Sequence, residues 1–371
     1  MKSDRGFAFS PAGELPAVEE LPDPFIMVDG GRLSEREDWQ GQREYIEQML
    51  LHYEYGNVPG PPGTIRAEQL SQREVLEGEA IEEVLKLHFG PSDGLEVRMS
   101  LVRPMGGGPY PVIIKNDREV GQVPVVPEII GREYIVAEYV RHDLDDDNGD
   151  RGDGVHPLYP EYSWGTLAAW AWGASRVIDY LSTLDFVDRD KIAITGHSRG
   201  GKTALLAAAL DERIAIAAPN GSGTGGAGSY RVQGQGAESL EDILTNFPYW
   251  FHPRLKGFVG RENRMPFDQH FLRSAVAPRA VISTDALGDH WANPLGTQEV
   301  YRASQVVFDW LGAGEMNAIH FREGGHHHAP EDWRALLDFA DFVFRGEGLE
   351  DPEEYRHLPF ETRDSFSWDA P

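Results

Sequence analysis

The sequence GHSRGGKT occupies residues 196–203 and follows the apolar run KIAIT at residues 191–195. The small and apolar run KTALLAAAL begins inside it, at residues 202–210. This order predicts a short buried strand that ends at a glycine-rich turn and continues as a helix. Two motifs with different chemistry share such a strand–turn–helix context, and this stretch matches both of them.

The first motif is the nucleophile elbow, G-x-S-x-G, formed by Gly196, Ser198 and Gly200. Its glycines allow a sharp turn, which exposes the serine hydroxyl at the N-terminus of the following helix. Backbone N–H groups at that position can hold an oxyanion. The elbow therefore predicts a serine nucleophile at residue 198.

The second motif is the phosphate loop, G-x-x-x-x-G-K-[ST], formed by Gly196, Gly201, Lys202 and Thr203. Asp285 lies after a later strand and is available to hold its magnesium ion. About half of the chain precedes the motif, however, whereas a phosphate loop usually follows the first strand of its domain. A nucleotide-binding protein therefore stays as the remote alternative to the elbow.

An elbow requires an acid and a histidine later in the chain, in that order. Two acid candidates, Asp285 and Asp289, follow the predicted strand at residues 280–284. Three histidines at residues 326–328 follow the predicted strand at residues 317–321, on a Gly-Gly turn. A histidine between a strand and a helix is typical of the base of an α/β-hydrolase. A surface metal patch is the less favoured interpretation of these histidines.

Predicted strands and helices alternate around the elbow, which indicates parallel strands with helices on both faces. The earlier strands alternate apolar and polar residues, as antiparallel strands do. We therefore expect an α/β-hydrolase fold: a three-layer α/β sandwich with a mostly parallel, doubly wound sheet and antiparallel N-terminal strands. The predicted strands span residues 81–89, 95–102, 111–115, 134–140, 191–195, 214–218, 280–284 and 317–321, and the predicted helices span residues 39–53, 164–184, 202–210, 297–311 and 331–344.

Three parts of the chain are expected from these patterns. Residues 1–62 are rich in proline and charge and are expected to form an N-terminal extension that packs on the core. Residues 63–371 are expected to form a single catalytic domain. Residues 221–264 lack a clean period and are expected to form an insertion over the top of the sheet.

The composition excludes several classes of function. The 371 residues include 34 Lys and Arg against 61 Asp and Glu, a formal net charge of −27, which argues against nucleic-acid and anionic-membrane partners. Cysteine is absent, so neither a disulfide nor a cysteine nucleophile is available. No run of 18 apolar residues and no signal-peptide pattern is present. We expect a cytoplasmic location, or secretion if the native N-terminus was trimmed.

The acidic loop DLDDDNGDRGD at residues 143–153 does not fit a calcium site. A calcium loop counted from Asp143 needs glycine at its sixth position and glutamate at its twelfth, where this chain has Asn148 and Gly154. A solvated acidic loop is therefore expected, and the chain is expected to use no metal and no cofactor.

Several segments resemble the glucuronoyl esterases, a family of carbohydrate esterases. ITGHSRGGKTAL at residues 194–205 is similar to the family's Ser-Arg-x-x-Lys elbow, and GGHHHAPEDW at residues 324–333 is similar to its histidine loop. The resemblance implies an α/β-hydrolase that cleaves esters of glucuronic or 4-O-methylglucuronic acid with alcohols, notably lignin alcohols. Further similar segments lie at residues 21–62, 238–251, 265–270 and 289–296.

The resemblance also implies catalytic roles. Ser198 would be the nucleophile, and Arg199 would stabilise the oxyanion with its backbone N–H and its guanidinium. His326 best matches the base, because its spacing to Asp332 and Trp333 agrees with the family's pattern.

Three further residues are implied to contact the sugar. Lys202 lies one turn after Ser198 on the same helix face. Glu238 and Trp291 match the sugar-binding Glu or Gln and the Trp of the family. Trp291 as a packed aromatic, Glu238 as a solvated helix start and Arg199 as a salt-bridge partner are the alternative interpretations.

The chain departs from the family's pattern at the triad acid. Many members carry a glutamate just after the strand that follows the elbow helix, where this chain has Gly221. Some bacterial members have an aspartate two residues before the tryptophan, and Asp289 matches that position. Asp289 is therefore assigned as the acid, with Asp285 in reserve.

The expected reaction is attack of Ser198 on a uronic acid ester, small or oligosaccharide, to form an acyl-enzyme. A second oxyanion donor is expected near Asn116. Two further functions stay open, namely an acetyl-xylan or general carboxylesterase of the same fold and a non-catalytic carbohydrate-binding relative. The sequence leaves the alcohol, the 4-O-methyl preference and the oligomeric state open.

Overall fold

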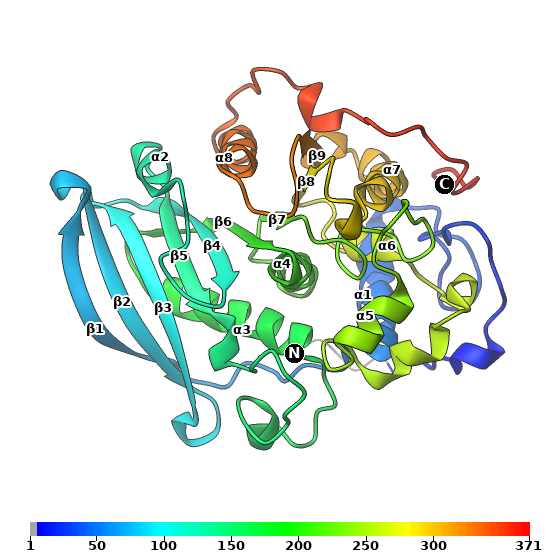
Figure 1. The fold of residues 1–371 in the computed structure, drawn as a ribbon, viewed down its shortest axis with the longest axis horizontal. Helices are drawn as coiled ribbons and strands as arrows, with labels where there is room; N and C mark the ends of the chain where they lie inside the picture. The colour runs from blue at the N-terminus through cyan, green and yellow to red at the C-terminus, as the bar shows by residue number, and fades with distance from the viewer. Residues whose placement is uncertain (1–5) are drawn as a thin grey trace.

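The computed structural model describes residues 6–371, in which nine strands form a single sheet. The strands are β1 (Arg66–Val75), β2 (Ala80–Phe89), β3 (Leu95–Pro104), β4 (Tyr110–Asp117), β5 (Ile135–Val140), β6 (Val187–His197), β7 (Ile216–Asn220), β8 (Ala280–Ala286) and β9 (Asn317–Arg322). Their order is β1-β2-β3-β5-β4-β6-β7-β8-β9 (Figure 1). The pairs β1–β2, β2–β3 and β3–β5 are antiparallel. The pairs β5–β4, β4–β6, β6–β7, β7–β8 and β8–β9 are parallel. The expected mixed sheet of an α/β-hydrolase is confirmed.

Helices cover both faces of this sheet. The α-helices in the described residues are α1 (Trp39–Leu50), α2 (Val126–Gly131), α3 (Thr166–Leu181), α4 (Arg199–Leu210), α5 (Leu240–Asn246), α6 (Gln269–Ser274), α7 (Pro294–Trp310) and α8 (Pro330–Arg345). Successive strand residues point to opposite faces. Ile114 and Ile194 share a core with α3 and α4, whereas Ile113 and Ala193 share another with α2 and α8. The three-layer sandwich follows from this alternation.

The chain around Leu21 lies beside the C-terminal segment. The N–H of Leu21 donates to the carbonyl of Ser365 at 2.8 Å, and the indole of Trp368 donates to the carbonyl of Leu21 at 2.8 Å. Helix α1 packs against α6. The division into an extension of residues 1–62 and a catalytic domain of residues 63–371 stays a prediction, and the first five residues lie outside the described part.

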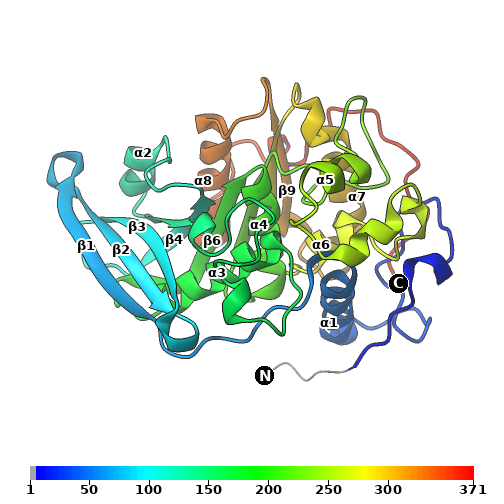
Figure 2. The same ribbon diagram turned by 60° about the horizontal axis from the view of Figure 1, so that its bottom comes forward.

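The sequence patterns did not predict strand β1 or the short helices α2, α5 and α6. Strand β1 was not expected, because its side chains are almost all exposed and it pairs only with β2 at the edge of the sheet. Figure 2 shows β1 to β3 extending on the side opposite α1, α5 and α7. Helix α5 lies within the expected insertion of residues 221–264. None of the helices in residues 6–371 has the length and apolar character that a membrane crossing requires.

Candidate active site

Ser198 occupies the sharp turn between β6 and α4. Its backbone has φ 55° and ψ −119°, a conformation that costs a non-glycine residue about 1–3 kcal/mol. A Cβ atom on Gly196 would overlap the carbonyl of Gly200, so glycine is needed for the chain to turn there. The strained geometry of a nucleophile elbow is present at residue 198.

Asn116, at the end of β4, holds this turn together. Its side-chain amide donates to the carbonyl of Gly200 at 2.9 Å and to that of Thr195 at 3.2 Å. Both side-chain N–H groups of Asn116 are therefore bound to the backbone of the elbow, and a second oxyanion donor near Asn116 stays a prediction.

His326 and Asp289 form a close pair from two loops. Nδ1 of His326, in the loop between β9 and α8, lies 2.5 Å from Oδ2 of Asp289, in the loop after β8. Asp289 is buried, whereas His326 is exposed on one side. Donation from Nδ1 to the carboxylate leaves Nε2 as the acceptor for a serine proton.

Most of the residues expected in the site line one open pocket of about 180 Å³. Asp289 stands behind His326 and is not part of the lining. The expected residues in the lining are Ser198, Arg199, Lys202, Glu238, Trp291 and His326.

Arg199 is paired with an acid at the edge of this pocket. Its guanidinium forms an ion pair with Asp147 and lies over the rings of Phe247 and Trp250, at 5.1 and 4.7 Å from their centroids. Trp250 donates its indole N–H to Asp147 at 2.7 Å, and Tyr249 donates its hydroxyl to the Asp147 carbonyl at 2.8 Å. The neighbours of the guanidinium therefore compensate its charge and restrain its direction.

Lys202 is buried beneath the pocket. Its ammonium donates to the carbonyls of Ser222 and Thr224 at 2.5 and 2.7 Å and lies 4.0 Å from the Glu238 carboxylate. Burial lowers the pKa of Lys202 to about 8, and burial raises the pKa of Glu238. With two ammonium hydrogens already bonded to the loop after β7, Lys202 both holds that loop and faces the pocket.

Trp291 is 49% exposed although it is a large aromatic residue. The interpretation of Trp291 as a packed core aromatic is therefore wrong. Its carbonyl accepts from the N–H of Glu238 at 3.0 Å, which ties the two sugar-contact candidates together. An exposed indole on the rim of a polar pocket is suited to stacking on the apolar face of a sugar ring.

Comparison with known proteins identifies the family of this chain. The family model "Glucuronyl esterase, fungi" matches residues 92–312. The chain belongs to the glucuronyl esterase family.

Individual relatives extend the similarity over most of the chain. A carbohydrate esterase from an unknown prokaryotic organism is 29% identical, covering 92% of this chain and 93% of the relative. A 4-O-methyl-glucuronoyl methylesterase of Podospora anserina is 29% identical over 84% of this chain, which spans 64% of that relative's length. A mutant glucuronoyl esterase from Sporotrichum thermophile, solved in complex with methyl 4-O-methyl-beta-D-glucopyranuronate, has 25% identity and a TM-score of 0.77, and 96% of each chain is covered.

Family membership identifies this chain as a carboxylic ester hydrolase. The interpretation of residues 196–203 as a phosphate loop is left without support. The relatives named as methylesterases are enzymes of this class. The Lys202 ammonium would have to contact a nucleotide phosphate, yet it is buried and bonded to two carbonyls.

Asp285, the alternative candidate for the triad acid, forms no hydrogen bond with His326. It is buried in β8, and neither of its carboxylate oxygens has a hydrogen-bond partner. Burial, together with the carboxylates of Asp289 and Asp332, raises the pKa of Asp285 well above its ordinary value. The ring of His326 is instead held by Asp289.

His197, between the elbow glycine and the nucleophile, was not recognised as part of the site. Its Nδ1 lies 2.7 Å from Oδ1 of Asn220, and its ring centroid lies 4.4 Å from that of His326. The Asn220 amide nitrogen donates to Thr284, so its oxygen faces His197 and accepts from Nδ1. Burial lowers the pKa of His197 to about 4, which keeps a neutral ring against the base.

The acidic loop differs from the expected solvated loop. Asp145 and Asp147 are both mainly buried, and Asp145 lies 3.0 Å from Nε2 of His156. A single sequence carries no signal that separates Asp147 from its exposed neighbour Asp146, because the partner Arg199 is 52 residues away.

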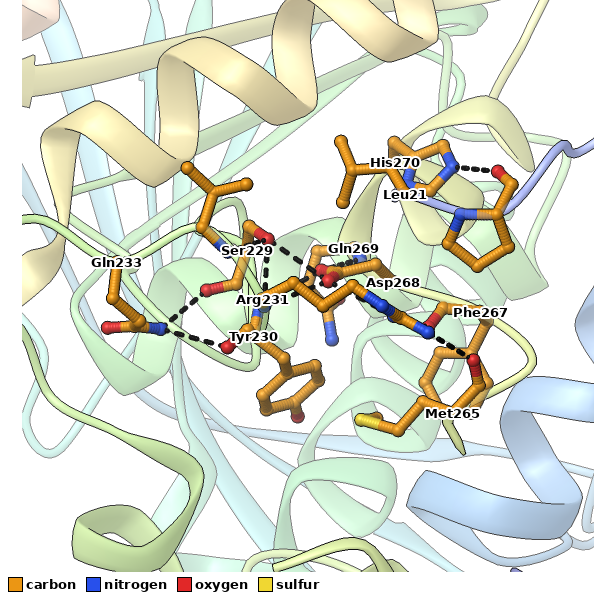
Figure 3. Close-up of polar contacts among 12 residues, drawn as sticks. Leu21, Ser229, Tyr230, Arg231, Gln233, Met265, Phe267, Asp268, Gln269 and His270 are labelled. Atoms are coloured by element: carbon orange, nitrogen blue, oxygen red, sulfur yellow. Dashed lines mark hydrogen bonds and ion pairs between the residues drawn. The ribbon is translucent and has the colours of Figure 1, made fainter. Parts of the chain in front are cut away.

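A buried polar cluster around Asp268 supports the loop after β7, whose carbonyls accept hydrogen bonds from Lys202. The Asp268 carboxylate accepts from the backbone N–H groups of Tyr230 and Arg231 and from the hydroxyl of Ser229, at 2.9–3.0 Å (Figure 3). The Arg231 guanidinium donates to the carbonyl of Phe267 at 2.8 Å. This loop thus has an ordered shape without regular secondary structure, which is why the sequence shows no period there.

Proposed function

We propose that this chain hydrolyses esters of glucuronic or 4-O-methylglucuronic acid with alcohols, using Ser198, His326 and Asp289. The observation that carries the proposal is the convergence of a strained serine and an aspartate-bound histidine on one pocket. The family supports the substrate class, because relatives are named as 4-O-methyl-glucuronoyl methylesterases.

The first half of the reaction follows the logic of a serine hydrolase. Nε2 of His326 takes the proton of the Ser198 hydroxyl as the oxygen attacks the ester carbonyl. The Asp289 carboxylate holds the ring and stabilises the imidazolium. Collapse of the tetrahedral intermediate returns the proton to the leaving alcohol and leaves an acyl-enzyme on Ser198.

The negative charge of the intermediate develops beside the N-terminus of α4. The backbone N–H of Arg199 lies at this position, and its guanidinium, whose charge is paired with Asp147, offers further N–H donors at the pocket. Each well-placed donor contributes about 3 kcal/mol to such a transition state. Water activated by His326 then attacks the acyl carbon and releases the uronic acid.

Substrate selection is assigned to the polar residues of the pocket. Lys202 and Glu238 offer a donor and an acceptor to sugar hydroxyls, and Trp291 offers a flat apolar surface. A general carboxylesterase would need none of these groups.

The test compares purified wild type with Ser198→Ala on benzyl glucuronate and on an aryl acetate. Wild type is expected to prefer the uronate ester, and Ser198→Ala is expected to lose activity by a factor on the order of 10⁴–10⁶. A fluorophosphonate probe should modify wild type and not the variant, and thermal unfolding of the two proteins should agree. Full activity of Ser198→Ala would overturn the mechanism, and a preference for the acetate would favour the general carboxylesterase.

A further inference from the structure

Both cationic side chains that line the pocket already have partners in the protein. The Arg199 guanidinium is paired with Asp147, and the Lys202 ammonium is bound to two carbonyls near Glu238. Asp147 is only 12% exposed at its side chain, and its carboxylate also accepts from Trp250. The pairing of Arg199 is therefore built into the fold and is not a loose surface contact.

The reaction changes the charge of the group that lies beside Arg199. Hydrolysis of the ester R–COOR′ with water gives the carboxylate R–COO⁻, the alcohol R′OH and a proton. The acyl carbon is bonded to Ser198 until the last step, so the new carboxylate forms next to residue 199. An unpaired arginine at this position would bind that carboxylate through two parallel hydrogen bonds.

We infer that Asp147 is a positioning residue that neutralises Arg199 in advance, so that the pocket accepts the neutral ester and releases the anionic acid. The inference rests on the proposed function. Asp147 restrains the guanidinium over Phe247 and Trp250 and places a negative charge where the product would otherwise find an unpaired cation. The acidic loop thereby sets the enzyme's preference between substrate and product.

The first measurement uses wild type alone. Glucuronic acid and its neutral amide, glucuronamide, compete with benzyl glucuronate near pH 7, and the two inhibition constants are compared. The expected result is that the acid binds no more tightly than the amide. An acid that binds ten times more tightly than the amide would overturn the inference.

The second measurement uses Asp147→Asn, which keeps the shape of the side chain and an oxygen for the Trp250 indole. Its affinity for the acid, relative to the amide, should rise about tenfold or more, because a charge-assisted bond to Arg199 becomes available. Structural damage alone would weaken both ligands and would not produce this gain. An unchanged ratio would contradict the inference.

Asp146→Asn is the matched control. Asp146 is the adjacent acid, is largely exposed and lies 2.8 Å from Nδ1 of His142, so this change removes the same charge without touching Arg199. Its ratio of acid affinity to amide affinity should equal that of wild type.

The proposed function and this inference fail in different ways. Wild type that neither cleaves benzyl glucuronate nor binds either ligand refutes the proposed function. An active enzyme that binds the acid far more tightly than the amide refutes only this inference.

Discussion

A Cβ atom placed on Gly221 would lie 3.6 Å from Oδ2 of Asp289. Gly221 follows β7 directly and has φ +48°, and its N–H donates to the carbonyl of Thr284 at 2.9 Å. A side chain at position 221 would therefore point at the carboxylate that holds His326. The aspartate from the loop after β8 and a longer side chain on residue 221 are alternative occupants of one space.

Replacing Asp289 by asparagine is expected to lower kcat by a factor on the order of 10⁴, because the amide no longer holds the productive tautomer of His326. Asp285→Asn is the matched control, since Asp285 is buried in the neighbouring strand and neither of its carboxylate oxygens has a hydrogen-bond partner. Steady-state kinetics on benzyl glucuronate should show the loss for residue 289 alone. A larger loss for Asp285→Asn would reverse the assignment of the acid.

The space at Gly221 predicts a rescue. Asp289→Ala with Gly221→Glu should recover at least about tenfold in kcat over Asp289→Ala alone, although the positive φ costs a side chain about 1–2 kcal/mol. Gly221→Gln in the same background has the same length without the charge and should recover nothing. Equal rates for the glutamate and glutamine variants would show that position 221 does not reach His326.

Trp291→Ala is expected to raise KM for benzyl glucuronate about three- to tenfold with a small change in kcat, because loss of a stacking surface weakens substrate and transition state alike. Stability should change by less than about 0.5 kcal/mol, since the indole is half exposed. Met105→Ala removes a similarly exposed apolar side chain outside the pocket and serves as the control. A large fall in the unfolding temperature of Trp291→Ala would return this residue to a core role.

Glu54, buried near the polar cluster of Asp268, predicts a pH dependence of stability. Its carboxylate accepts from Tyr230 and Gln269, and burial raises its pKa from 4.5 to about 8. Between these values the folded state holds a proton that the unfolded state releases, so the free energy of unfolding should fall as pH rises. Relative to Glu54→Gln, wild type should lose up to about 1.4 kcal/mol per pH unit between about pH 5 and pH 8.

Denaturant unfolding of both proteins across this pH range measures the difference. Because the glutamine does not titrate, any background pH dependence is common to the two proteins and cancels. A difference that stays constant with pH would show that Glu54 is ionised in the folded protein.

Much of the fold was predictable because it depends on local patterns. The elbow sequence, the buried strands around it and the order of acid and base are properties of short segments, and the structure places β6, β8 and β9 where those segments lie. Strand β1 was missed because an exposed edge strand carries no apolar pattern. The choice of Asp289 over Asp285 rested on the family resemblance and on the standard position of the acid in hydrolases, and the catalytic role of Asp289 stays a prediction.

The sequence by itself determined the chemistry that is available: a serine on a strand–turn–helix segment, acids and histidines downstream of it, and no cysteine. Only the tertiary structure decided which charges meet. Asp147 reaches Arg199 across 52 residues, and His326 packs against His197 from a distant loop, because parallel strands bring the ends of distant segments to one edge of the sheet. Such pairings depend on three-dimensional proximity and burial, which leave no periodic trace in a single chain.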